Sequence, residues 1–235
     1  MTFNPALTTQ DLIWLAQIEP ARRLEGETWT HVLVTYTNCY YIAHPEGKPS
    51  RVRECLKSTG LFVTYTPDVA DLTTCNSTAK SWYWDAAYAR LYVHTSTAAD
   101  PGVGSGLFYI NSYFWERLAD RQVDLVDLLV DTISHPYRPL LDPSSITDLS
   151  FEATQFSEGG IAQSFGSVVA LNPGGYWDSR LADYVYEGKR MVIRFGYSGD
   201  AYADYIKLFD GYTGGWTWTD GTVVFDTEDP RRFQE

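Results

Sequence analysis

The chain has 235 residues, of which 44% are hydrophobic, and a formal net charge of −12. This length fits one large all-β domain or two smaller domains, each with a hydrophobic core. The acidic balance disfavours general binding to a phosphate backbone, and no window approaches the roughly 20 apolar residues of a membrane-spanning helix. We therefore expect a soluble protein with no specific nucleic-acid binding and no membrane insertion.

Aromatic residues are frequent: 8 Trp, 17 Tyr and 11 Phe. Such side chains suit the half-buried surface of a sheet, and they also suit interfaces. The three cysteines are an odd number without metal-knuckle spacing, so we expect reduced thiols. The N-terminus has no basic region followed by an apolar run, so no signal peptide is expected.

The N-terminal half predicts short strands. Thr9 could cap a short helix over residues 10–17, but the alternation of residues 12–18 favours a first strand. β-branched and aromatic content predicts further strands at 32–37, 61–65, 81–84 and 90–94. The intervening residues 84–90 would form the loop of a hairpin.

A linker-like segment rich in Gly and Ala occupies residues 98–106. It favours a division into an N-terminal β-rich region, residues 1–104, and a C-terminal β-barrel-like region, residues 105–235. The same segment could instead be a long loop inside one interleaved fold.

The C-terminal half has clearer strand signals. Residues 122–133 fit either a helix or a strand, whereas residues 148–156 alternate with the period of a half-buried strand. Residues 178–186 form the best candidate for a short helix. Further strands, separated by turns that include the glycine-rich residues 211–215, are predicted at 166–171, 190–195, 205–209, 216–218 and 222–225. The sequence thus predicts a mostly β fold, a barrel or split-barrel/sandwich with short helices and long loops.

A corner with distinct turn chemistry follows the strand at 166–171. The residues expected to shape this corner are Asn172, Gly174, Gly175, Trp177, Asp178 and Gly188. The asparagine and the glycines tolerate positive φ and can reverse the chain tightly. The tryptophan can then plug the end of a barrel, the aspartate can cap the helix that follows, and the last glycine lets the chain re-enter the sheet.

The order of these motifs resembles tail-tip, baseplate-hub proteins of siphophage-like and related phages. The resemblance covers residues 81–226, and the segments that carry it are 82–85, 91–94, 100–101, 137–141, 146–151, 165–178, 186–196, 209–212 and 223–226. In that group an Asn-x-x-Gly turn, an aromatic-Asp pair, a Gly-Lys/Arg strand and a Phe-x-Gly strand follow one another. The first 80 residues contribute almost nothing to the resemblance.

The resemblance implies a virion structural protein, either a baseplate hub or a distal tail protein, that is assembled in the host cytoplasm. Its partners would be further copies of itself in a closed trimeric or hexameric ring, and other tail and baseplate proteins. The ring would join the tail tube to host-recognition components and let DNA pass during ejection. The net charge alone adds a further hypothesis: carboxylates lining the bore of such a ring would repel DNA from the wall.

No pattern indicates catalysis, and we expect no catalytic, cofactor-binding or metal-binding residues. None of the four histidines has metal-binding spacing, and no G-x-S-x-G motif occurs. The glycine-rich residues 102–106 lack the lysine of a P-loop.

Paired tryptophans support an alternative function, a carbohydrate-binding β-sandwich module. Trp82 and Trp84, and likewise Trp216 and Trp218, lie two apart, so on a strand each pair faces one side. Such a pair could stack on a glycan, or one pair could line a core and the other an interface. Burial decides between these cases, because buried indoles cannot form a glycan platform.

Overall fold

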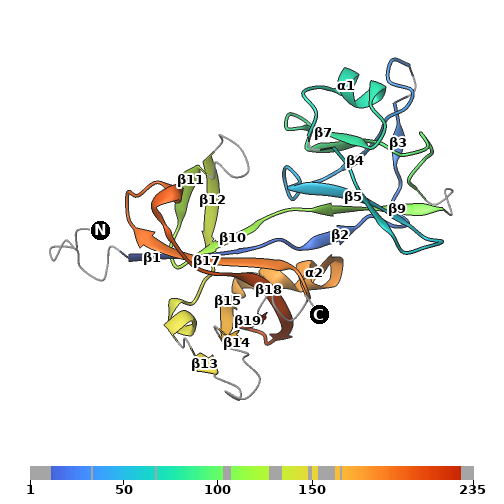
Figure 1. Ribbon diagram of the computed structural model, residues 1–235. Helices are drawn as coiled ribbons and strands as arrows, with labels where there is room; N and C mark the ends of the chain where they lie inside the picture. Colours follow the sequence, from blue (N-terminus) through green and yellow to red (C-terminus); the bar gives the residue numbers. More distant parts are fainter. Residues whose placement is uncertain are drawn as a thin grey trace. The chain divides into compact units, whose positions relative to one another are not determined.

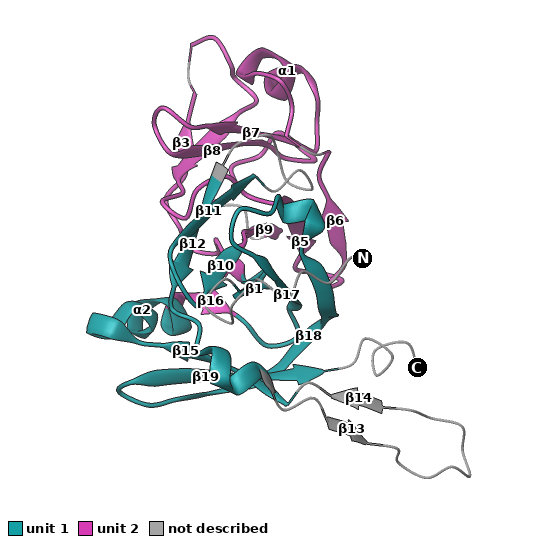
Figure 2. Cartoon of the chain, turned by 90° about the vertical axis from the view of Figure 1, so that its left-hand side faces the viewer, with its two compact units in different colours: residues 1–20, 116–182, 186–235 teal, residues 21–115, 183–185 magenta. Residues whose placement is uncertain are grey.

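The structure is a computed structural model that describes residues 12–32, 34–66, 68–102, 107–126, 134–147, 150–152, 162–164 and 166–228. The protein is mostly β, which confirms the predicted fold class. Its two compact units are unit 1, formed by Met1–Pro20, Glu116–Ala182 and Tyr186–Glu235, and unit 2, formed by Ala21–Trp115 and Asp183–Val185 (Figure 2).

The units do not follow the predicted boundary at residue 104. The N-terminal strand β1 (Leu12–Ile18) pairs with β10 (Glu116–Ala119) on one side and with β17 (Arg190–Tyr197) on the other. The beginning of the chain therefore belongs to the same unit as its C-terminal half. Long-range strand pairing determines the two units. The linker-like composition of residues 98–106 gives no information about that pairing.

Unit 1 contains an eight-stranded sheet with the order β11-β12-β10-β1-β17-β18-β19-β15 (Figure 1). Its remaining strands are β11 (Val123–Val126), β12 (Ser134–Pro139), β15 (Ser167–Leu171), β18 (Ile206–Trp218) and β19 (Thr222–Glu228). Unit 1 also contains helix α2 (Tyr176–Asp183), the 3₁₀ turns η2 (Pro143–Thr147), η3 (Pro173–Gly175) and η4 (Tyr202–Asp204), and the two-stranded sheet of β13 (Ser150–Glu152) and β14 (Ala162–Ser164).

Residues 12–18 form strand β1, as the alternation of their side chains predicted. Ile13 and Leu15 of β1 pack in a buried cluster with Tyr137 of β12 and with Tyr202 and Tyr205. Of the ambiguous segment 122–133, residues Val123–Val126 form strand β11, and residues 127–133 lie outside the described residues.

The predicted turn at residues 211–215 is wrong, because these residues lie inside the long strand β18. The pairing of β18 with β19 shifts its register between Thr213 and Trp216, so the two intervening glycines form a β-bulge. A bulge bends a strand without ending it, which explains why the glycines do not separate two strands.

Unit 2 contains a five-stranded sheet of order β16-β2-β9-β5-β6 and a four-stranded sheet of order β3-β4-β8-β7. The first comprises β2 (Ala21–Arg23), β5 (Arg51–Leu56), β6 (Phe62–Thr64), β9 (Phe108–Tyr113) and β16 (Tyr184–Val185). The second comprises β3 (Thr30–His31), β4 (Tyr40–Ala43), β7 (Ser81–Asp85) and β8 (Arg90–His94). Helix α1 (Leu72–Ser77), which the sequence analysis did not predict, begins after Asp71, whose carboxylate accepts a hydrogen bond from the backbone N–H of Thr74.

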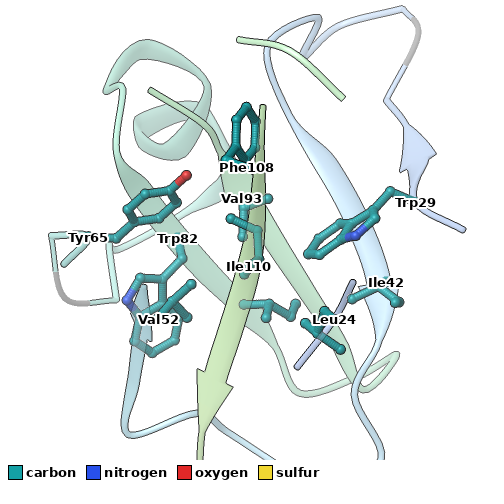
Figure 3. Close-up of a cluster of buried hydrophobic side chains, with 10 residues drawn as sticks. Leu24, Trp29, Ile42, Val52, Tyr65, Trp82, Val93, Phe108 and Ile110 are labelled. Carbon is teal, nitrogen blue, oxygen red and sulfur yellow. The ribbon is translucent and has the colours of Figure 1, made fainter. Parts of the chain in front are cut away.

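Side chains of both sheets share the core of unit 2. Val52, Phe108 and Ile110 of the five-stranded sheet pack in one buried cluster with Trp82 and Val93 of the four-stranded sheet (Figure 3). Sheets that share a core in this way form a sandwich. Within the described residues no sheet closes into a barrel, so the sandwich alternative of the predicted fold fits the structure.

The predicted strand at residues 32–37 is wrong. Its described residues 34–37 lie between β3 and β4 outside any strand, the backbone N–H of Cys39 donates to the carbonyl of Tyr36, and Val34 is 91% exposed. β-branched residues favour strands only where a pleated surface is available to pack against, and Val34 has none.

Candidate functional site

The predicted corner begins where β15 ends, at Asn172. The side-chain oxygen of Asn172 accepts a hydrogen bond from the backbone N–H of Trp177 at 2.9 Å, and its Nδ2 donates to Oδ1 of Asp178 at 3.0 Å. Asp178 therefore lies within the first turn of α2 and is not its N-cap, which corrects the prediction for this residue. Asn172 makes the hydrogen bond to the helix start because η3 folds its side chain back over that turn.

The glycines of the corner have the expected conformation. Gly174 and Gly175 have φ of 61° and 75°, and Gly188, in the turn before β17, has φ of 65°. Positive φ favours glycine because it lacks a Cβ. The backbone N–H of Gly188 donates to the carbonyl of Thr213 at 2.8 Å, and this bond returns the chain to the sheet beside the bulge of β18.

Alanine at Gly175 is expected to lower the melting temperature more than alanine at Gly174. Positive φ costs a non-glycine residue about 1–2 kcal/mol at either position. A Cβ on Gly175 would also lie 2.6 Å from Oδ2 of Asp178, whereas no atom lies within 4 Å of a Cβ on Gly174. Calorimetric melting of both variants checks this order, and unchanged melting of both would contradict the described turn.

Trp177 is the centre of the corner. Its side chain is fully buried, and its Nε1 donates to the carbonyl of Leu171 at 3.0 Å. Its ring meets those of Tyr186 and Phe225 edge to face, with centroid distances of 5.9 and 5.4 Å. Trp177 thus packs α2 onto β19 in an open sheet, where the sequence analysis expected it to plug a barrel.

A groove lies on the outer side of this corner, between α2 and the end of β18. Its volume is about 410 Å³, and its lining residues are Asp178, Leu181, Ala182, Trp216 and Trp218. Both indoles belong to β18 two residues apart, so they face the same side of the sheet. They are 39% and 47% exposed, which meets the condition set above for a glycan platform.

Ion pairs and hydrogen bonds hold the helix that forms one wall of the groove. Arg180 Nε lies 3.3 Å from Glu116 Oε1, and the Tyr176 hydroxyl donates to Glu116 Oε2 at 3.1 Å. The Arg180 guanidinium also stacks 4.4 Å from the centroid of the Tyr176 ring. Burial and the neighbouring Glu116 carboxylate raise the pKa of Tyr176, so its hydroxyl remains a donor at neutral pH. These contacts fix α2 against β10.

The other tryptophan pair offers no platform. Trp82 is 2% exposed and lies in the core of unit 2 (Figure 3). Trp84 is half-buried, packs against the same cluster and meets the ring of His44 at a centroid distance of 5.8 Å. This pair supports the core of a domain.

His44 and the cysteines of the described residues lie in packed surroundings that do not resemble a catalytic or metal site. Buried His44 lies with Nε2 2.9 Å from the Ser112 hydroxyl, and its burial lowers its pKa. The cysteines are free and buried. Among the residues that the structure describes, no three His, Cys, Asp or Glu side chains gather as metal ligands, and no helix is long and apolar enough to cross a membrane.

An exposed apolar patch on unit 2 was not predicted. Leu61 and Phe62, at the start of edge strand β6, are 63% and 49% exposed; we call these two residues the β6 edge patch. Strand β6 ends the order of its sheet. Sequence patterns alone gave no signal, since exposed and buried leucines look alike.

Comparison with known proteins does not extend these observations: no protein-family model, no curated protein and no solved structure matches the chain.

Proposed function

We propose that this protein is a structural component of the tail tip of a tailed bacteriophage, either a baseplate hub or a distal tail protein. Its role is mechanical: a closed ring of trimeric or hexameric symmetry joins the tail tube to host-recognition components. The protein acts in the virion after assembly in the host cytoplasm, with other tail and baseplate proteins as neighbours.

One observation carries the proposal. Two segments that carry the resemblance, within residues 166–178 and 186–196, meet in one corner of the fold. Asn172 bonds to the start of α2, and Trp177 packs on Tyr186 and Phe225. This C-terminal part of the motif order thus packs as one structural element, as expected for a motif that defines a fold.

The β6 edge patch supports assembly. An edge strand presents unpaired backbone groups to a neighbour, and Leu61 and Phe62 add exposed apolar side chains at this edge. A subunit that repeats around a closed ring covers such an edge with the next copy. The patch therefore suits a contact with a second copy of this chain.

Charging the patch is expected to break the ring. The double variant L61E/F62E should reduce the mass measured by light scattering from that of a trimer or hexamer to that of the monomer, because two carboxylates cannot be buried unpaired in the contact. Val34→Glu is the matched control, since Val34 is exposed on the same unit but lies outside the patch.

Negative-stain images of the same samples show whether the wild-type particles are closed rings. Rings in the wild type and in Val34→Glu, with monomers in L61E/F62E, would support the proposal. A wild-type chain that stays monomeric at every concentration would contradict ring formation.

A further inference from the structure

The groove between α2 and the end of β18 is held in shape from both sides. On the helix side, Trp177 and Arg180 fix α2 to β19 and to β10. On the strand side, Thr219 and Thr222 close the β18–β19 hairpin, and the backbone N–H of Asn172 donates to the carbonyl of Gly221 at 2.9 Å. Figure 1 shows α2 next to this hairpin. A preformed groove binds without the loss of entropy that ordering a loop would require.

The exposure of the two indoles needs an explanation. The residues directly opposite them on β19, Phe225 and Val223, are fully buried, so this face of the sheet is otherwise packed. Trp216 and Trp218 extend the same face beyond the cover of α2. Large apolar side chains that stay exposed next to a groove mark interaction sites.

The chemistry of the groove combines flat apolar faces with a hydrogen-bond acceptor. An indole offers a large rigid surface on which a flat ligand can stack. The Asp178 carboxylate accepts one bond from Asn172, and an ionised carboxylate has about four lone-pair sites in all, so it can also accept from a ligand hydroxyl. Sugar rings have this pair of properties, a flat C–H face and a rim of hydroxyl groups.

The negative charge of the groove and of the chain disfavours anionic ligands. Asp178 lines the groove, and the chain has a formal net charge of −12. Anionic polysaccharides would meet repulsion at this surface, whereas neutral ones would not. We propose that the groove binds a neutral polysaccharide. Trp216 and Trp218 stack on consecutive sugar rings, and the Asp178 carboxylate accepts a hydrogen bond from a sugar hydroxyl. This site goes beyond the structural role proposed above and does not depend on it.

Affinity electrophoresis in native gels tests the site. Gels containing dextran, mannan or laminarin are compared with gels containing the anionic polysaccharide alginate. Retardation of the full-length protein is expected in at least one neutral gel and not in alginate. W216A/W218A should bind that neutral polysaccharide about tenfold more weakly or worse, a loss of about 1.4 kcal/mol, because both stacking surfaces are removed.

Tyr88→Ala is the matched control, because Tyr88 is an aromatic side chain, 68% exposed, on the other unit. It should bind like the wild type, and circular dichroism should show all variants folded. The proposal is overturned if no neutral polysaccharide retards the protein, if alginate alone does, or if W216A/W218A binds normally. It is also overturned if W216A/W218A lowers the oligomer mass and the wild type shows no glycan binding, because the groove would then hold a second copy of the chain.

Discussion

Replacing Trp177 with alanine is expected to lower the free energy of unfolding by about 3–5 kcal/mol, the range for large aromatic residues removed from cores. The indole is fully buried, meets Tyr186 and Phe225 edge to face, and donates to the Leu171 carbonyl. Its loss leaves a cavity that the rigid sheet beneath it cannot close. Urea unfolding followed by circular dichroism measures the change.

Trp216→Ala provides the matched comparison for Trp177. It removes the same side chain from the same unit at a position that is 39% exposed. It should therefore lower the free energy of unfolding by only a small fraction of the decrease caused by Trp177→Ala. Equal destabilisation by the two substitutions would show that Trp177 is not the centre of the corner.

Replacing Gly211 with valine is expected to destabilise the protein by about 1–3 kcal/mol or more through overpacking. A Cβ at this position would lie 2.6 Å from the backbone oxygen of Glu228 and 2.9 Å from Cε2 of Phe209. Neither atom can move freely, because β18 and β19 pair in this region and Phe209 is buried. The melting temperature measures the effect.

Gly215→Ala controls for the loss of a glycine from the same strand. A Cβ there would make an ordinary contact of 3.7 Å with Oδ2 of Asp226, and the backbone has no positive φ. Its melting temperature should stay close to that of the wild type. A larger effect at Gly215 than at Gly211 would contradict the close approach of β18 and β19.

Several strands could be predicted from the residue types of short segments alone. The hairpin of β7 and β8 was predicted from residues 81–84 and 90–94 because both segments are rich in aromatic and β-branched side chains and a short loop joins them. The strand predicted at 61–65 is β6, and those predicted at 190–195 and 222–225 are the cores of β17 and β19. The side chains of the alternating segment 148–156 lie outside the described residues.

Features set by long-range contacts were not predictable in this way. The predicted helix at 178–186 begins earlier, at Tyr176, and ends at Asp183, because Tyr184 and Val185 pair with β2 instead. Val34 lies in a β-branched run yet stays exposed, since no sheet covers it. The interleaved units likewise follow from the pairing of β1 with β17, which no local composition encodes.

The candidate groove also depends on long-range contacts that the sequence did not reveal. The spacing of Trp216 and Trp218 predicted that they share a face, but not that they would be exposed while Trp82 is buried. Their exposure depends on where α2 stops covering the sheet, which the packing of Trp177 decides. Leu181 and Ala182 of the groove were missed, because a leucine and an alanine on a short helix give no functional signal.

The location of the protein in virus particles tests the central proposal most directly. If the proposed function holds, a phage encodes the chain, and gold-marked antibodies raised against the purified chain would be applied to its virions and imaged by electron microscopy. The proposed function predicts gold at the distal end of the tail. Gold on the capsid, or intact virions that contain none of this chain by mass spectrometry, would contradict it.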